Sequence, residues 1–173
     1  MRKTLLLMLL PIIVFSQFSE SNLPIVIIKT NGQAILDKTR IVCDMGIIDN
    51  GFGNINSVND PFTGYNGKIS IEYRGSSSQS FPKKSYALET QDSLGNNNNI
   101  SLLGIPVEND WILYAPYSDK SLMRNFLTFY LGNKMGRYAP RTKYCELVVN
   151  GDYRGVYVLM EKIKRDNDRV DIA

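Results

Sequence analysis

Apolar runs separated by turn-forming residues divide the first half of the chain into short segments. Residues 23–30 and 40–48 are rich in Ile and Val, a composition typical of β-strands. The Asn31-Gly32 pair between them is a turn signal. Residues 49–66 are rich in Gly, Asn and Asp, so the pattern predicts a long loop there.

Alternation of polar and apolar residues predicts further strands. At 68–73 every second residue is apolar or aromatic, which gives one face of a strand to Ile69, Ile71 and Tyr73. Residues 84–88 and 110–115 resume the strand pattern, and we expect Trp111 to be buried. Residues 144–160 predict a hairpin, because Asn150-Gly151 between two β-rich runs supplies the φ > 0 residues of a tight turn.

A single helix is expected between the last two strand regions. Ser118 or Asp119 would serve as its N-cap, and Gly136 would end it. Helical spacing predicts that one face is buried, formed by Leu122, Met123, Phe126, Leu127 and Tyr130. Strands, one helix and then a hairpin predict an α+β fold, an antiparallel sheet with one packed helix.

The N-terminus has the features of an export signal. Arg2 and Lys3 precede an apolar run, residues 5–15, and Ser16 is a small residue suited to cleavage. The run is shorter than the roughly 20 residues that span a bilayer. We therefore predict a signal peptide at 1–16, a secreted or cell-surface protein, and no membrane contact after cleavage. A short uncleaved anchor is the alternative.

Charge and composition exclude several classes of function. The 173 residues carry a formal charge of +3, and without Arg2 and Lys3 only +1, so no basic field favours nucleic acid. The chain has no histidine, which excludes a Ser-His triad or a histidine metal site within it. Cys43 and Cys145 both lie in apolar runs, where a disulfide and two buried thiols are equally compatible with the sequence.

Four stretches of the chain together resemble the CotH kinase family, the spore-coat-type atypical protein kinases. They occur in the order found in the family and cover much of the chain after residue 16. The stretches are EYRGSSSQSFPKKSYALE (72–89), LLGIPVENDW (102–111), YSDKSLMRN (117–125) and NGDYRGVYVLMEKI (150–163).

This resemblance implies a protein-kinase-like domain over residues 17–173, of which the N-terminal half is present. It implies the small lobe of that fold, truncated after the hinge, and transfer of the ATP γ-phosphate to Ser or Thr of coat or surface proteins. ATP and Mg²⁺, or another divalent metal, would be the cofactors. We expect the catalytic acids beyond residue 173, so this sequence alone would be inactive.

Phosphoryl transfer requires groups that position phosphate. The loop at 74–82 begins Arg74, Gly75, Ser76, Ser77, Ser78, small residues whose backbone N–H groups and hydroxyls suit phosphate oxygens. Lys83 and Lys84 follow directly, and we favour Lys84 as a phosphate ligand because it shares a strand face with Tyr86. A plain turn followed by solvated lysines is the alternative.

The remaining candidates come from the kinase comparison. No acid occurs between Lys120 and Lys134, so the usual helix glutamate for the lysine is missing, and Glu72, Glu89 or Asp119 could replace it. Arg124 and Asn125 belong to a shared stretch and could organise phosphate. Met160, Glu161 and Lys162 resemble a kinase hinge, whose backbone would pair with adenine.

Two other functions are compatible with the sequence. The same fold could serve as a non-catalytic secreted or cell-surface binding module. A glycan-binding β-domain is suggested only by the content of Tyr and Asn.

Overall fold

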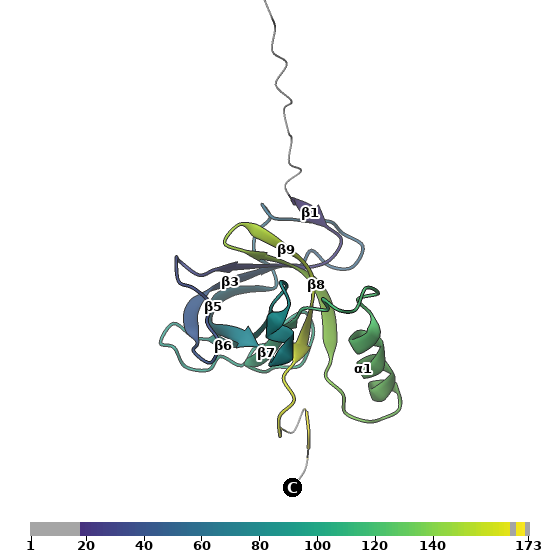
Figure 1. Cartoon of the computed structure of the whole chain (residues 1–173). Helices are drawn as coiled ribbons and strands as arrows, with labels where there is room; N and C mark the ends of the chain where they lie inside the picture. Colours follow the sequence, from purple (N-terminus) through teal and green to yellow (C-terminus); the bar gives the residue numbers. More distant parts are fainter. Residues whose placement is uncertain (1–17, 167–168, 172–173) are drawn as a thin grey trace, which may run out of the picture.

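The computed structural model describes residues 18–166 and 169–171. The predicted signal peptide, 1–16, lies outside these residues. Most of the described chain forms one β-barrel, with a single α-helix standing beside it (Figure 1).

The barrel strands agree with those expected from the hydrophobic pattern, whereas the two-residue strands β1 and β4 were not expected, and β4 lies within the predicted loop at 49–66. The elements, in chain order, are β1 (Glu20–Ser21), β2 (Ile25–Lys29), β3 (Ile41–Ile48), β4 (Asn56–Ser57), β5 (Tyr65–Arg74), the 3₁₀ turn η1 (Ser77–Ser80), β6 (Ser85–Gln91), β7 (Asp110–Tyr114), α1 (Arg124–Lys134), β8 (Thr142–Val149) and β9 (Asp152–Glu161). The predicted β8–β9 hairpin is confirmed, with φ of 53° at Asn150 and 81° at Gly151.

The strands close on themselves in the order β2-β3-β5-β6-β7-β9-β8. All neighbours are antiparallel except β2 and β8, which pair in parallel, from Ile25 opposite Glu146 to Ile28 opposite Val149. The predicted α+β sheet resembling a kinase small lobe is therefore wrong. Hydrophobic alternation locates strands, but it does not reveal that β2 pairs with β8, which lies about 120 residues later in the chain.

The barrel interior is the hydrophobic core. Alternate residues of each strand point inward, so the pleat of the sheet fills the barrel with aliphatic and aromatic side chains. Trp111 is fully buried, as expected, and the largest other interior groups include Tyr157, Ile28, Met45, Ile69, Ile71 and Leu88. Cys43 and Cys145 are both buried and both free.

The helix begins later than predicted. Asp119 does accept hydrogen bonds from backbone N–H groups, those of Ser121 and Arg124 at 3.0 and 2.8 Å. Leu122 nevertheless has φ of 58°, which a right-handed helix does not accommodate, so the helix starts after it. Gly136, with φ of 72°, follows the last turn as expected for a C-terminal cap.

The predicted buried face of the helix is also wrong. No residue of α1 is buried, and the exposed apolar residues include Met123, Leu127 and Tyr130. The helix contacts the outside of β8, where Phe126 stacks on Tyr144 with ring centroids 4.8 Å apart. Among the described residues, no helix is long and apolar enough to span a membrane.

Candidate functional site

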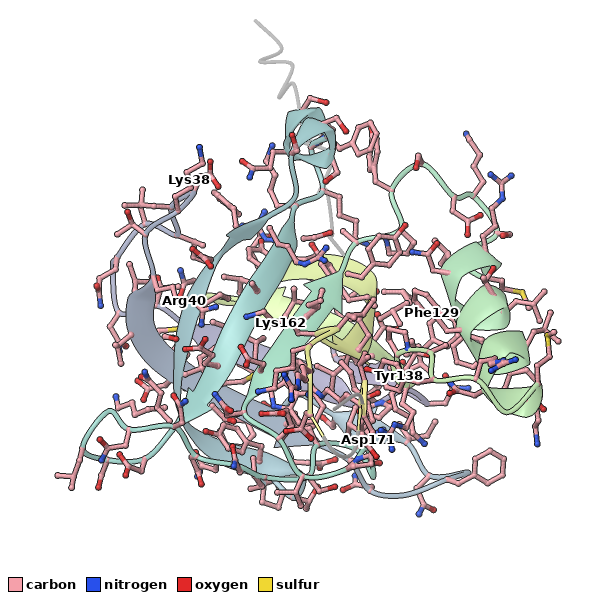
Figure 2. All side chains as sticks on the ribbon, turned by 90° about the horizontal axis from the view of Figure 1, so that it is seen from below. Lys38, Arg40, Phe129, Tyr138, Lys162 and Asp171 are labelled. Atoms are coloured by element: carbon pink, nitrogen blue, oxygen red, sulfur yellow. The ribbon has the colours of Figure 1, made fainter. Side chains whose placement is uncertain are left out.

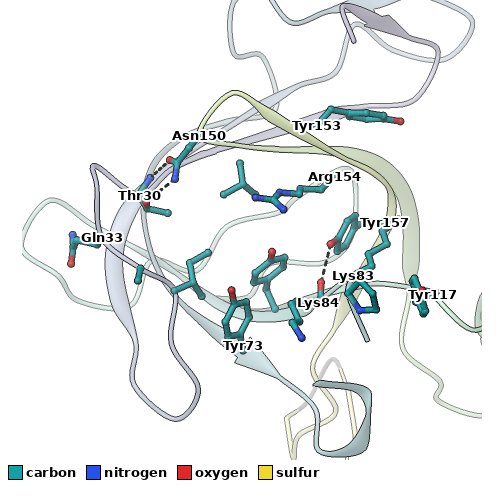
Figure 3. A pocket seen from close by; sticks show the side chains of 15 residues that line it. Thr30, Gln33, Tyr73, Lys83, Lys84, Tyr117, Asn150, Tyr153, Arg154 and Tyr157 are labelled. Atoms are coloured by element: carbon teal, nitrogen blue, oxygen red, sulfur yellow. Dashed lines mark hydrogen bonds between the residues drawn. The ribbon is translucent and has the colours of Figure 1, made fainter. Parts of the chain in front are cut away.

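One end of the barrel opens into a cavity of about 570 Å³ (Figure 3). The segment after β2, the start of β6 and the β8–β9 hairpin meet around it. The lining residues are Thr30, Gln33, Ala34, Ile35, Tyr73, Pro82, Lys83, Lys84, Tyr86, Tyr117, Val149, Asn150, Tyr153, Arg154 and Tyr157. We call this cavity the mouth pocket.

The charged groups of the mouth pocket are all cationic. Lys83, Lys84 and Arg154 line it, and none of its lining residues is an Asp or Glu. The Lys83 Nζ donates a 2.6 Å hydrogen bond to the Val156 carbonyl oxygen and lies 4.6 Å from the centroid of the Tyr157 ring. Burial lowers the pKa of Lys83. Arg154 also pairs with an acid outside the lining, its Nη2 lying 3.0 Å from the Asp152 carboxylate. Three cations with no acid in the lining suit an anionic ligand.

Tyrosines form the other wall of the mouth pocket. The Tyr86 ring lies 5.7 Å from that of Tyr73 and 6.1 Å from that of Tyr157, centroid to centroid. The Tyr157 hydroxyl donates to the Lys84 carbonyl oxygen at 2.9 Å. Burial raises the pKa of both Tyr86 and Tyr157, so their hydroxyls remain protonated at neutral pH.

The side-chain amide of Asn150 holds the hairpin that carries Arg154 over the end of the barrel. Asn150 accepts a hydrogen bond from the Thr30 backbone N–H at 2.8 Å and donates to the Thr30 hydroxyl at 2.9 Å (Figure 3). The sequence predicted this hairpin only as a structural element, and Arg154 was not identified as a candidate site residue. Its position could have indicated a role, because Arg154 follows directly after the turn that brings the chain back to this end of the barrel.

The predicted phosphate loop lies at the rim of the mouth pocket. None of Arg74, Gly75, Ser76, Ser77 and Ser78 lines the cavity. The loop is tied to the site through the residues that follow: the Lys84 Nζ donates to the Gln79 carbonyl oxygen. The Gln79 amide in turn donates to the Gly75 carbonyl oxygen at 2.7 Å. Of the predicted phosphate ligands, the structure brings Lys83 and Lys84 together.

Arg124 and Asn125 lie at the start of α1 and do not line the mouth pocket. The Arg124 side chain is exposed, and its Nε lies 3.5 Å from the Asp119 carboxylate. Asp119 has a lowered pKa, chiefly because Ser121 donates a hydrogen bond to it. This acid therefore holds the turn before α1 and is not the partner of Lys83 or Lys84.

The other acids proposed for the lysine partner are also engaged elsewhere. Arg40, on the outside of the barrel (Figure 2), lies 3.2 Å from Glu72 and 2.8 Å from Glu89. In the structure, both lysines donate to backbone carbonyl oxygens.

The hinge-like residues lie at the opposite end of the barrel. From Tyr157 to Glu161 the strand advances about 13 Å, at roughly 3.3 Å per residue. The Glu161 carboxylate accepts hydrogen bonds from the Arg141 backbone N–H and Nε at 2.7 and 3.0 Å. Met160 is buried, and the Lys162 carbonyl oxygen accepts a hydrogen bond from Arg169.

Arg169 is the centre of a buried ionic cluster at this end. Its Nε lies 3.6 Å from Glu108 and 3.8 Å from Glu161, and its side chain is 1% exposed. Lys162 and Lys164 pair with Asp110 at 3.0 and 2.9 Å. This cluster binds the last described residues to the base of β7, and its groups are already paired.

A divalent metal does not fit the mouth pocket. Mg²⁺ takes oxygen ligands, mostly carboxylates and phosphates, and the protein charges lining the pocket are cations. Among the residues the structure describes, no three His, Cys, Asp or Glu side chains are grouped so as to hold a metal ion.

Comparison with known proteins adds two findings. The model of a protein family described as CotH kinase protein matches residues 71–172. The inner spore coat protein H of Bacillus subtilis (strain 168) is 30% identical over 95 residues, which is 55% of this chain and 24% of that protein. The matched part thus spans about a quarter of the length of this curated relative. The region matched by the family model includes the β5–β6 loop, both lysines and Arg154.

Proposed function

This chain belongs to the CotH kinase family, and from that premise we propose that it is the phosphate-binding part of an exported protein kinase of a coat or cell surface. Such a kinase transfers the γ-phosphate of ATP to a Ser or Thr hydroxyl of a protein substrate. The observation that carries the proposal is the convergence of Lys83, Lys84 and Arg154 on a cavity with no acid in its lining.

Each of these residues has a distinct part in this function. Lys83 is held by Val156 and the Tyr157 ring, so its ammonium is positioned before a ligand arrives. Lys84 joins the pocket to the Ser-rich loop through Gln79. Arg154 would exchange its exposed partner Asp152, 3.0 Å away, for a phosphate that its guanidinium contacts through two N–H groups. Each lysine acts instead as a point charge. Together they would bind and orient a polyphosphate.

The reaction itself needs groups that the mouth pocket does not contain. Attack on the γ-phosphorus breaks its bond to the bridging oxygen and forms a bond to the substrate oxygen. We expect the acid that orients the attacking hydroxyl, and the oxygen ligands of Mg²⁺, beyond residue 173. Mg²⁺ would neutralise the charge that develops on the phosphates.

The deciding experiment measures ATP binding to the intact natural protein by thermal unfolding. ATP at about 100 times its dissociation constant should add about 2.7 kcal/mol of stability. The double variant Lys83→Met/Lys84→Met should lose this stabilisation, while Arg137→Met, an exposed cation just after α1 that does not line the pocket, should keep it. Equal stabilisation of all three proteins would refute the assignment of phosphate to the mouth pocket.

A non-catalytic binding module is the second candidate, and the closed barrel is the observation that favours it. The module would bind a phosphate-bearing component of the surface without transferring phosphate. Pyrophosphate would then stabilise the protein as much as ATP, and a labelled-ATP assay on the intact protein would give no labelled product. Transfer of label to a Ser or Thr side chain would exclude this alternative.

A further inference from the structure

Helix α1 carries its apolar side chains on the outside of the molecule. Five large apolar residues on or beside it are 46 to 78% exposed: Met123, Leu127, Tyr130, Leu131 and Met135. A helix that is apolar on its outer face is ordinarily covered by another surface. Figure 1 shows α1 standing outside the barrel next to β8.

Few contacts hold α1 against the barrel. Besides the Phe126–Tyr144 stack, the Tyr144 hydroxyl donates to the Leu122 carbonyl oxygen at 2.8 Å. A helix of 11 residues is marginal in water without packing. An exposed apolar face on such a helix is therefore costly unless another surface covers it.

A groove of about 380 Å³ runs between α1 and β8. Ile105, Phe126 and Tyr130 contribute apolar and aromatic surface to it, and Lys134, Arg141 and Lys143 contribute cations. Lys134 lies over the Tyr130 ring, 5.5 Å from its centroid. No acidic residue lines the groove. Its lining thus offers a place for an apolar side chain beside cations that can pair with carboxylates.

The charge of the chain is concentrated around this groove. Residues 120–143 contain six cations and no acid: Lys120, Arg124, Lys134, Arg137, Arg141 and Lys143. The chain has 20 Lys and Arg and 17 Asp and Glu, so the rest of it carries 14 cations and 17 acids, a net charge of −3. A basic region on an otherwise acidic chain attracts an acidic partner and orients it.

We propose that the α1–β8 groove is a docking site for an acidic segment of a partner protein. The segment inserts an apolar or aromatic side chain between Phe126 and Tyr130 and pairs its carboxylates with Lys134 and Lys143. Arg141 is partly engaged by Glu161 and contributes less. A peptide fits better than a membrane surface, because the apolar atoms line a recess and not only an exposed face. This docking is independent of phosphate binding in the mouth pocket.

The test is selection of short random peptides displayed on phage against the intact protein, with counter-selection on Lys134→Glu/Lys143→Glu. Enriched peptides should combine net negative charge with Leu, Ile, Phe or Trp. The best of them, synthesised with a fluorophore, should bind the double variant at least about ten-fold more weakly, a difference of 1.4 kcal/mol. Binding to Lys38→Glu, across the barrel from α1 (Figure 2), should be unchanged. Circular dichroism of both variants verifies that they fold.

Three results would overturn the proposal. The first is enrichment of peptides without an excess of acids, or equal binding to the double variant. The second is co-sedimentation with vesicles of equimolar phosphatidylcholine and phosphatidylglycerol, lost in the double variant, with no acidic peptide enriched; a membrane would then be the partner. The third is a concentration-dependent dimer in sedimentation that the double variant abolishes, which would assign the face to a second copy of the chain.

Discussion

The ammonium group of Lys83, just before β6, lies 4.6 Å from the centroid of the Tyr157 ring on β9. The contact is partly removed from water, and burial lowers the pKa of Lys83. A lysine in this state is held in place for an anion, yet loses its proton more readily than an exposed lysine.

This lowered pKa predicts opposite pH dependences for ligand binding and stability. As the pH rises toward about 10, Lys83 deprotonates before an ordinary lysine would, and pyrophosphate affinity should fall. In the same window the folded protein binds fewer protons than the unfolded chain, so stability of the free protein should rise. Calorimetric titrations and urea unfolding at several pH values measure both trends. Lys83→Met should flatten both, and unchanged slopes would contradict the role of Lys83.

A second pH dependence is expected at low pH from Asp110. Burial alone would raise the pKa of Asp110, but hydrogen bonds from Lys164 and Lys162 outweigh it and lower the pKa to about 2. The contribution of ionised Asp110 to folding stability is therefore complete above about pH 4 and is lost as the pH falls toward about 2. The lowering of its pKa on folding corresponds to about 2 kcal/mol of stability. Urea unfolding of Asp110→Asn should show a smaller loss of stability across this window than the parent protein.

Removing Arg169 should destabilise the barrel strongly. Its guanidinium is almost completely buried between Glu108 and Glu161 and donates to the Asp110 carbonyl oxygen at 3.0 Å. Arg169→Met would leave buried carboxylates without this partner, a change that costs about 3–5 kcal/mol. The exposed Arg137→Met is the matched control and should cost less than about 0.5 kcal/mol. A small effect of Arg169→Met in urea unfolding would show that the ionic cluster does not hold this segment.

The sequence pattern predicted local structure well and closure of the sheet poorly. Strand alternation and the Asn150-Gly151 turn depend on neighbouring residues, and both are confirmed. The parallel pairing of Ile25 with Glu146 depends on residues far apart in the chain, for which single-sequence periodicity holds no information. The apolar face of the helix was wrongly predicted to be buried. Apolar spacing shows which residues share a face of a helix, but it does not show whether another part of the chain covers that face.

The candidate site was predicted in the same uneven way. Lys83 and Lys84 were found because they follow a loop of small residues. Arg154 was missed, since only the folded hairpin brings it over the same cavity. The hinge-like residues were grouped with the lysines by resemblance, whereas the barrel separates Glu161 from Lys83 by most of a strand length. Whether Met160, Glu161 and Lys162 bind adenine stays a prediction.

The two cysteines should behave as inert thiols. Cys43 and Cys145 point into the barrel from strands separated by β2, and burial raises the pKa of each to about 12. A thiol reagent should therefore label neither in the native protein and both in denaturant. Reductant should not change the unfolding temperature. Loss of stability on reduction would show that a disulfide forms after all.

The loop beside the lysines should depend on Gly75. Its φ of 117° is strained for any other residue, and an added Cβ would collide with the Ser78 hydroxyl oxygen. Gly95 has a φ of 84° but open space around it, so a substitution there measures backbone strain without a collision. Gly95→Ala should cost about 1 kcal/mol from backbone strain alone, whereas Gly75→Ala should cost more.

Because the Gln79 amide donates to the Gly75 carbonyl oxygen and Lys84 donates to Gln79, Gly75→Ala should also weaken phosphate binding. Adding Ser78→Ala should restore part of the stability, since it removes the colliding oxygen, but not the part due to φ. Urea unfolding and pyrophosphate titration of the three variants give both quantities. Weaker binding in Gly75→Ala and unaltered binding in Gly95→Ala would connect the loop to the mouth pocket. Equal affinities would show that the loop at 74–82 is only a turn between two strands.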